Sequence, residues 1–149
     1  MMMALTVASR TGGQSFFVTY TNQDGVSGRT SQTVRQDTSA AIGAVTTSVS
    51  NIVNSGSPFI PLQNGDSGVR SIESVTMLGA DVGLFSLLLV KPLFTTQVRS
   101  ITAVHEKDLF MSCVGLPVIQ DDAFIGMVGN TNGTIANAVF IGDFKVIWD

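Results

Sequence analysis

The stretch of this sequence most suggestive of chemistry is Gly65-Asp66-Ser67-Gly68, the string in which many serine proteases carry their nucleophile. A nucleophilic serine needs an imidazole base and a carboxylate that orients it. The chain has one histidine, His105, and it follows the serine, whereas proteases with this string run His, Asp, Ser. The hydrolase elbow, Gly-x-Ser-x-Gly before a helix, does not fit either, because an apparent strand follows. An acyl hydrolase using Ser67 is therefore our least favoured hypothesis.

The alternative for residues 64–68 is a tight turn between two strands. Glycines supply the unusual φ angles that such turns need, and aspartate side chains bond to backbone amides nearby. We therefore predict that Gly65 and Gly68 take special φ values and that Asp66 accepts from local amides.

Metal and cofactor sites are also not indicated by the residue pattern. His105 stands beside Glu106 and near Asp108, but there is no second histidine and no cysteine pair, and neighbouring strand residues point to opposite faces. Asp121-Asp122 and Asp143 lack the Asp-x-Asp-x-Asp spacing of a calcium loop, and no phosphate-binding loop is present. We predict no catalytic, metal-binding or cofactor-binding residue, and an exposed turn at His105.

Three features indicate a soluble protein made in a reducing cytoplasm. The lone Cys113 has apolar neighbours and is typical of a buried thiol. Residues 1–4 lack the basic start of a signal peptide. The apolar run at 82–90 is far shorter than the roughly 20 residues of a membrane span.

Charge is sparse in this chain. The eight Lys and Arg residues are scattered singly and the net charge is -3, which argues against a nucleic-acid partner. Charged residues make up 13% of the sequence, against roughly 25% in ordinary soluble domains. A folded monomer of this size exposes on the order of 7,000 Å² of surface, so the few charged side chains would be widely separated on it. We infer that part of the surface meets another protein.

The elements that carry these residues read mainly as strands. Residues 14–21, 69–78, 84–90 and 95–104 are rich in β-branched and apolar residues. Residues 26–36 read as loop, residues 38–54 fit helix or strand and weakly favour strand, and residues 58–62 are extended because of two prolines. The loop at 79–83 has hairpin length. Residues 123–129 and 134–148 flank an Asn132-Gly133 hairpin signal.

These features predict an all-β fold. With 15 glycines and frequent turn signals, the chain fits a single antiparallel β-sandwich over residues 1–149, a jelly roll of about eight strands. Residues 1–12 are a candidate extended arm, and a terminal segment such as residues 1–9 could add a strand to a neighbouring capsid or sister subunit.

The run at 84–90 is apolar at positions that would face both sides of a sheet. In an antiparallel sandwich one side normally meets water, so this strand needs a cover, either a loop or a partner subunit. The candidate residues for an oligomer or capsid interface are Leu84, Phe85, Leu87, Leu89, Leu93 and Phe94.

Residues 57–75, residues 87–93 and the Asn-Gly hairpin that closes on Trp148 resemble small virion proteins of tailed bacteriophages, in particular head decoration or cement proteins. The resemblance covers roughly the C-terminal two-thirds of the chain. It implies a jelly-roll protein, often a homotrimer, that binds the major capsid protein on the exterior of the virion and stabilises the shell without catalysis. The alternative is a trimeric receptor-binding or fibre module of the phage tail, which would present exposed aromatic and polar loops.

Overall fold

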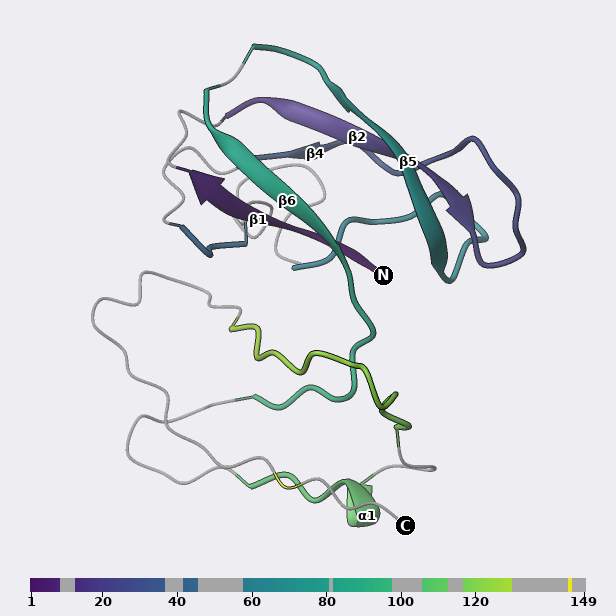
Figure 1. Cartoon of the computed structure of the whole chain (residues 1–149), viewed down its shortest axis with the longest axis vertical. Coiled ribbons are helices and arrows are strands. Elements are labelled where there is room, and N and C mark those ends of the chain that lie inside the picture. The colour runs from purple at the N-terminus through teal and green to yellow at the C-terminus, as the bar shows by residue number, and fades with distance from the viewer. Residues whose placement is uncertain are drawn as a thin grey trace.

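A computed structural model describes residues 1–8, 13–36, 42–45, 58–80, 82–97, 106–112, 117–129 and 145. In this part of the chain the strands form antiparallel sheets, which confirms the all-β class (Figure 1). The strands are β1 (Met2–Ala8), β2 (Ser15–Asn22), β3 (Arg29–Thr30), β4 (Val34–Arg35), β5 (Val69–Met77) and β6 (Leu84–Leu89), and one short helix, α1, spans Leu109–Ser112. No helix among the described residues is long and apolar enough to cross a membrane.

The larger sheet is built around β2. This strand pairs with β3 and β4 along one edge and with β5 along the other. Its side chains alternate between half-buried and buried, and Phe16, Val18 and Tyr20 are completely buried. The alternation follows from the two-residue repeat of a strand, which sends successive side chains to opposite faces.

The smaller sheet pairs β1 with β6 in one register from Met2 opposite Leu89 to Thr6 opposite Phe85, and the register shifts before Ala8, which lies opposite Leu84. The predicted arm at residues 1–12 is therefore wrong for the part described, because Met2–Ala8 is an inner strand of its own subunit. Met2 and Ala4 have no exposed surface, and β1 is bridged along its far edge by Ile60 and Val45. The apolar start of the chain is used in the core.

The two sheets share one hydrophobic core. Its buried members come from β1, β2, β4 and residue 60, and they are Met2, Ala4, Phe16, Val18, Tyr20, Val34 and Ile60. Phe85 and Leu87 of β6 pack against this cluster, and the ring centroids of Phe16 and Phe85 lie 5.1 Å apart. Such tilted aromatic pairs contribute more than their buried area alone.

The sequence located β2, β5 and β6 closely but misjudged how they pair. The hairpin expected at 79–83 does not form, because β5 pairs with β2 while β6 crosses to the other sheet and pairs with β1. The segment at 26–36, read as loop, contributes β3 and β4.

In the C-terminal half the outcome differs from the sequence reading. Residues 95–97 and 123–129 are described and contain no strand. The remainder of the predicted strand at 95–104, the Asn132-Gly133 hairpin and the strand at 134–148, apart from residue 145, lie outside the described residues.

Replacing Phe16 with alanine should destabilise the fold strongly, because its ring is buried where the two sheets meet. We expect Phe16→Ala to lower the free energy of unfolding by about 3 to 5 kcal/mol, measured by urea denaturation. The control Leu78→Ala removes a side chain that is 56% exposed and should change it by about 0.5 kcal/mol or less. Equal losses for the two variants would contradict the shared core.

Candidate functional site

The Gly65 to Gly68 turn is held by a polar cluster centred on Asp66. One carboxylate oxygen of Asp66 accepts from the Tyr20 hydroxyl at 2.7 Å and from Nε of Arg29 at 2.9 Å. The other accepts from Nδ2 of Asn22 at 2.8 Å. Only 2% of the Asp66 side chain is exposed. The three donors come from β2 and β3, so the turn is fixed to the end of the larger sheet.

Electrostatics favour the ionised form of this carboxylate. The hydrogen bond from Arg29, followed by those from Asn22 and Tyr20, lowers the pKa of Asp66 from 3.8 to about 2. Burial and the hydrogen bond to Asp66 raise the pKa of Tyr20 above its ordinary value of 10.0. At neutral pH the cluster is therefore an ionised carboxylate surrounded by three donors, and neither Asp66 nor Tyr20 is ready to transfer a proton.

The backbone of the turn shows why glycines occur there. Gly65 has a φ of 90°, as predicted. Gly68 does not share this positive φ. A Cβ atom at Gly68 would lie 3.2 Å from Cβ of Gln23, so the close approach of Gln23 favours glycine at this position. The amides of Ser67 and Gly68 donate to Oε1 of Gln23. The prediction that Asp66 would cap local amides is thus wrong, since Gln23 has that role and Asp66 binds side chains.

Ser67 lies exposed at the surface of this turn. The neighbouring carboxylate of Asp66 already accepts hydrogen bonds from three side chains, those of Tyr20, Asn22 and Arg29. His105, the one histidine of the chain, lies outside the described residues. Among the described residues, this string therefore has a structural role, because hydrogen bonds to Asp66 fix the turn to β2.

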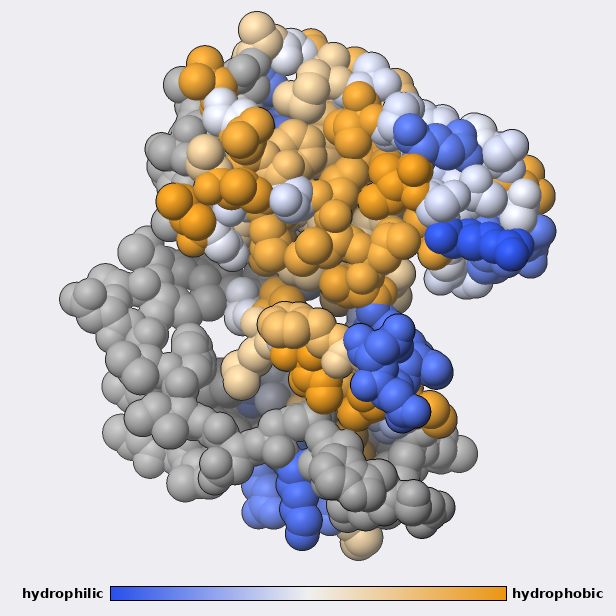
Figure 2. Space-filling view, in the orientation of Figure 1, coloured by the Kyte–Doolittle hydropathy of each residue, from blue (hydrophilic) through white to orange (hydrophobic). Residues whose placement is uncertain are grey.

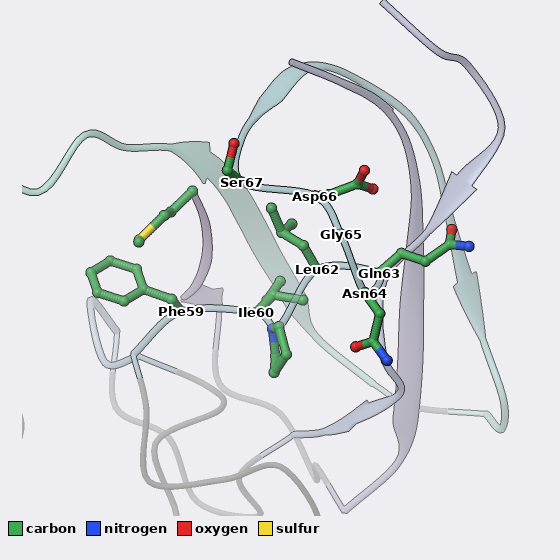
Figure 3. A pocket seen from close by; sticks show the side chains of 10 residues that line it. Phe59, Ile60, Leu62, Gln63, Asn64, Gly65, Asp66 and Ser67 are labelled. Atoms are coloured by element: carbon green, nitrogen blue, oxygen red, sulfur yellow. The ribbon is translucent and has the colours of Figure 1, made fainter. Parts of the chain in front are cut away.

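A pocket of about 600 Å³ opens beside the turn, lined by Met1 and residues 59–67. Phe59 lies on the opposite side of it from Gln63 and Asn64 (Figure 3). The amino group of Met1 donates to the carbonyl of Val90 at 2.9 Å, and burial lowers the pKa of this amine. The charged groups around the pocket are thus already paired within the chain, and its lining is mainly apolar.

Candidate metal ligands do not gather in the described part of the chain. There, no group of three or more His, Cys, Asp or Glu side chains is arranged to hold a metal ion. Asp121 and Asp122 form an exposed turn. Asp143 and Cys113 lie outside the described residues.

The six predicted interface residues divide into two groups. Phe85 and Leu87 are half-buried and face the core of their own subunit. Leu84, Leu89 and Phe94 are exposed, and Leu93 is half-buried. Strand alternation places Leu84, Ser86 and Leu88 on the outer face of β6, and all three are exposed. Leu89 shares the inner face with Phe85 and Leu87 but is 48% exposed at the end of the strand.

The sequence reading also missed exposed apolar residues on β5 and β6. Leu88 belongs with Leu84 on the outer face of β6, and it is 38% exposed. Val75 and Met77 on β5 are also exposed, although strand alternation places them on the same face as the buried Val18 and Phe16 opposite them. Their exposure depends on which strands cover β5, and no local sequence signal reports it. Figure 2 shows the result, a broad apolar surface over the part of the molecule that contains β1, β5 and β6.

The acid dependence of stability should identify Asp66. Its folded pKa is depressed, so its stabilising effect is complete above pH 3.8 and is lost as the pH falls towards 2. We expect Asp66→Asn to be less stable than the wild type at neutral pH and to lack this part of the acid dependence. Chemical denaturation between pH 2 and 7 measures both.

Asp24→Asn is the matched control for Asp66→Asn. It removes an exposed carboxylate from the adjacent loop and should leave the acid dependence of the wild type in place. If Asp66→Asn and the wild type lose stability in parallel below pH 4, the assigned role of the cluster is wrong.

Comparisons with protein-family models, curated proteins and solved structures find no match to this chain.

Proposed function

We propose that this chain is a viral structural protein, a decoration or cement protein that binds the exterior of a tailed-bacteriophage head and stabilises the shell. In this role it associates with copies of itself, as a trimer, and with the major capsid protein. The role requires buried contact area between subunits and no reaction at a catalytic group.

The observation that carries this proposal is the outer face of β6. Leu84 is 63% exposed and Leu88 is 38% exposed, and no charged residue occurs anywhere in β6. Burying one leucine side chain contributes about 1.5 to 3 kcal/mol. Soluble monomers usually place charges or proline on exposed strands to prevent association. An unprotected apolar strand is therefore best explained by a partner that covers it.

The sequence supports the viral assignment in two ways. The low content of charged residues, 13%, suits a protein that spends its working life in an assembly. The resemblance of residues 57–75 and 87–93 to small phage virion proteins indicates which kind of assembly. Assembly onto the shell would follow synthesis in the bacterial cytoplasm and leave the protein on the virion exterior.

We also propose that the complete domain is a β-sandwich of about eight strands with jelly-roll connections. A β-sandwich consists of two sheets packed on one core. The sheet containing β2 and β5 and the sheet of β1 and β6 share a core in this way. Further strands from the C-terminal half would widen both sheets.

Self-association is the first test of this proposal. The wild-type chain should sediment as an oligomer, with a mass near three subunits, at micromolar concentration. Leu84→Lys and Leu88→Lys should each weaken association by at least about tenfold, because each places a charge where the proposed subunit contact would bury a leucine. Sedimentation velocity over a dilution series measures the change.

Val26→Lys is the control, because Val26 is 51% exposed in the polar loop after β2. It should leave association unchanged. A wild-type chain that sediments as a monomer would contradict the self-association on which the proposal depends.

The position in the virion is the second test. A reconstruction of the phage particle, with antibody labelling of this protein, should place it on the outside of the head. Density and label only at the tail would overturn the decoration role in favour of the tail receptor-binding module.

A further inference from the structure

The hydrogen-bond register of the smaller sheet shows which N–H and C=O groups of β6 point away from β1. Met1 and Val90 exchange two backbone bonds, each 2.9 Å long. In an antiparallel ladder such pairs alternate with pairs that make no bond to each other. Leu88 and Ser86 therefore bond to β1, whereas the N–H and C=O groups of Leu87 and Leu89 point to the opposite edge of β6.

This opposite edge, the open edge of β6, has no strand beside it among the residues that the structure describes. The far edge of β1 is used differently, because the carbonyl of Met2 accepts from Ile60 at 2.8 Å and that of Thr6 accepts from Gly43 at 2.8 Å. Among the described residues, the far edge of β1 is thus bridged, whereas no strand lies beside the open edge of β6. The edge-facing backbone groups of Leu87 and Leu89, on an apolar strand, form a template for another strand.

The larger sheet indicates where the missing strand would lie. Val75 and Met77 lie opposite Val18 and Phe16 in register and so face the same side as these core residues. They nevertheless remain 39% and 37% exposed. In the view of Figure 1, β1 and β5 lie on opposite sides of β6. A strand added at the open edge of β6 would extend the smaller sheet on the side where β5 lies in this view.

Residues 123–129 of the same chain are an exposed apolar segment that is not paired in a sheet. Residues 123–129 read Ala-Phe-Ile-Gly-Met-Val-Gly, an uncharged sequence with strand propensity. In the structure they form neither helix nor strand, and Phe124 is 96% exposed and Met127 81% exposed. Their described backbone bonding is a single turn contact, from the amide of Ala123 to the carbonyl of Gln120 at 3.0 Å.

We propose that residues 123–129 of a second copy of this chain pair with the open edge of β6 and cover Val75 and Met77. Seven extended residues span about 23 Å, which is long enough to pass both Leu87 and Leu89. Both surfaces are uncharged, so the contact leaves no charge buried and unpaired. Because each copy carries both the open edge and the segment, exchange around a closed ring of three copies satisfies both in every subunit.

This inference rests on the proposed self-association and names the contact that produces it. Benzoylphenylalanine, which is photoreactive, is substituted for Phe124 in the full chain, and the protein is mixed with an equal amount of ¹⁵N-labelled wild type. After irradiation, mass spectrometry should find cross-links between light and heavy copies that map to β5 and β6. The same probe in place of Val26 should give none there.

Two substitutions provide an independent readout. Phe124→Asp and Met127→Asp should each weaken association at least tenfold in sedimentation experiments, whereas Gln120→Asp, outside the pairing segment, should not. Cross-links confined to one copy, or between copies but away from β5 and β6, would overturn the exchange while leaving self-association intact. A wild-type sample that is monomeric would overturn both proposals.

Discussion

The packing of β6 across β2 is the contact on which the rest of the structure depends. Phe85 and Leu87 meet Phe16 and its buried neighbours, and through them two separate sheets share one core. β5 and β6 are consecutive strands, yet they lie in different sheets. Phe85 therefore lies over the larger sheet, while Leu84 and Leu88 are left on the outside. The apolar character of β6 on both faces follows from having a core on one side and, in our proposal, a partner on the other.

Unequal width is the second constraint. Among the described residues the larger sheet joins four strands and the smaller one two, and the larger sheet's inner face remains exposed at Val75 and Met77. A single subunit has no described strand for this place, while its residues 123–129 expose large apolar side chains. The proposed decoration role and the proposed strand exchange have the same physical origin, because both would bury apolar side chains that a single copy leaves exposed. The Asp66 cluster has a different role, because it fixes the turn at 63–68 to β2 through charge-assisted hydrogen bonds.

Sequence patterns predicted the strands and turns well where residues close in sequence determine the structure. Strands at 15–22, 69–77 and 84–89 follow from β-branched and apolar runs bounded by turn residues, and Gly65 takes the positive φ expected of a tight turn. Long-range contacts decided the rest. The partners of Asp66 lie 37 to 46 residues away in sequence, so no local motif reports them. The apolar start of the chain resembles an arm until β6 is placed beside it, and the strand expected at 123–129 does not form in one copy.

Amide hydrogen exchange at the open edge of β6 tests the central claim most directly. The account predicts that the amides of Leu87 and Leu89 exchange slowly at concentrations where the full chain is associated and much faster when it is diluted to monomers. The amide of Val90, bonded to Met1 within the subunit, should change far less. Equal exchange of Leu87 and Leu89 in the associated and diluted samples would contradict the claim that a neighbouring copy covers this edge.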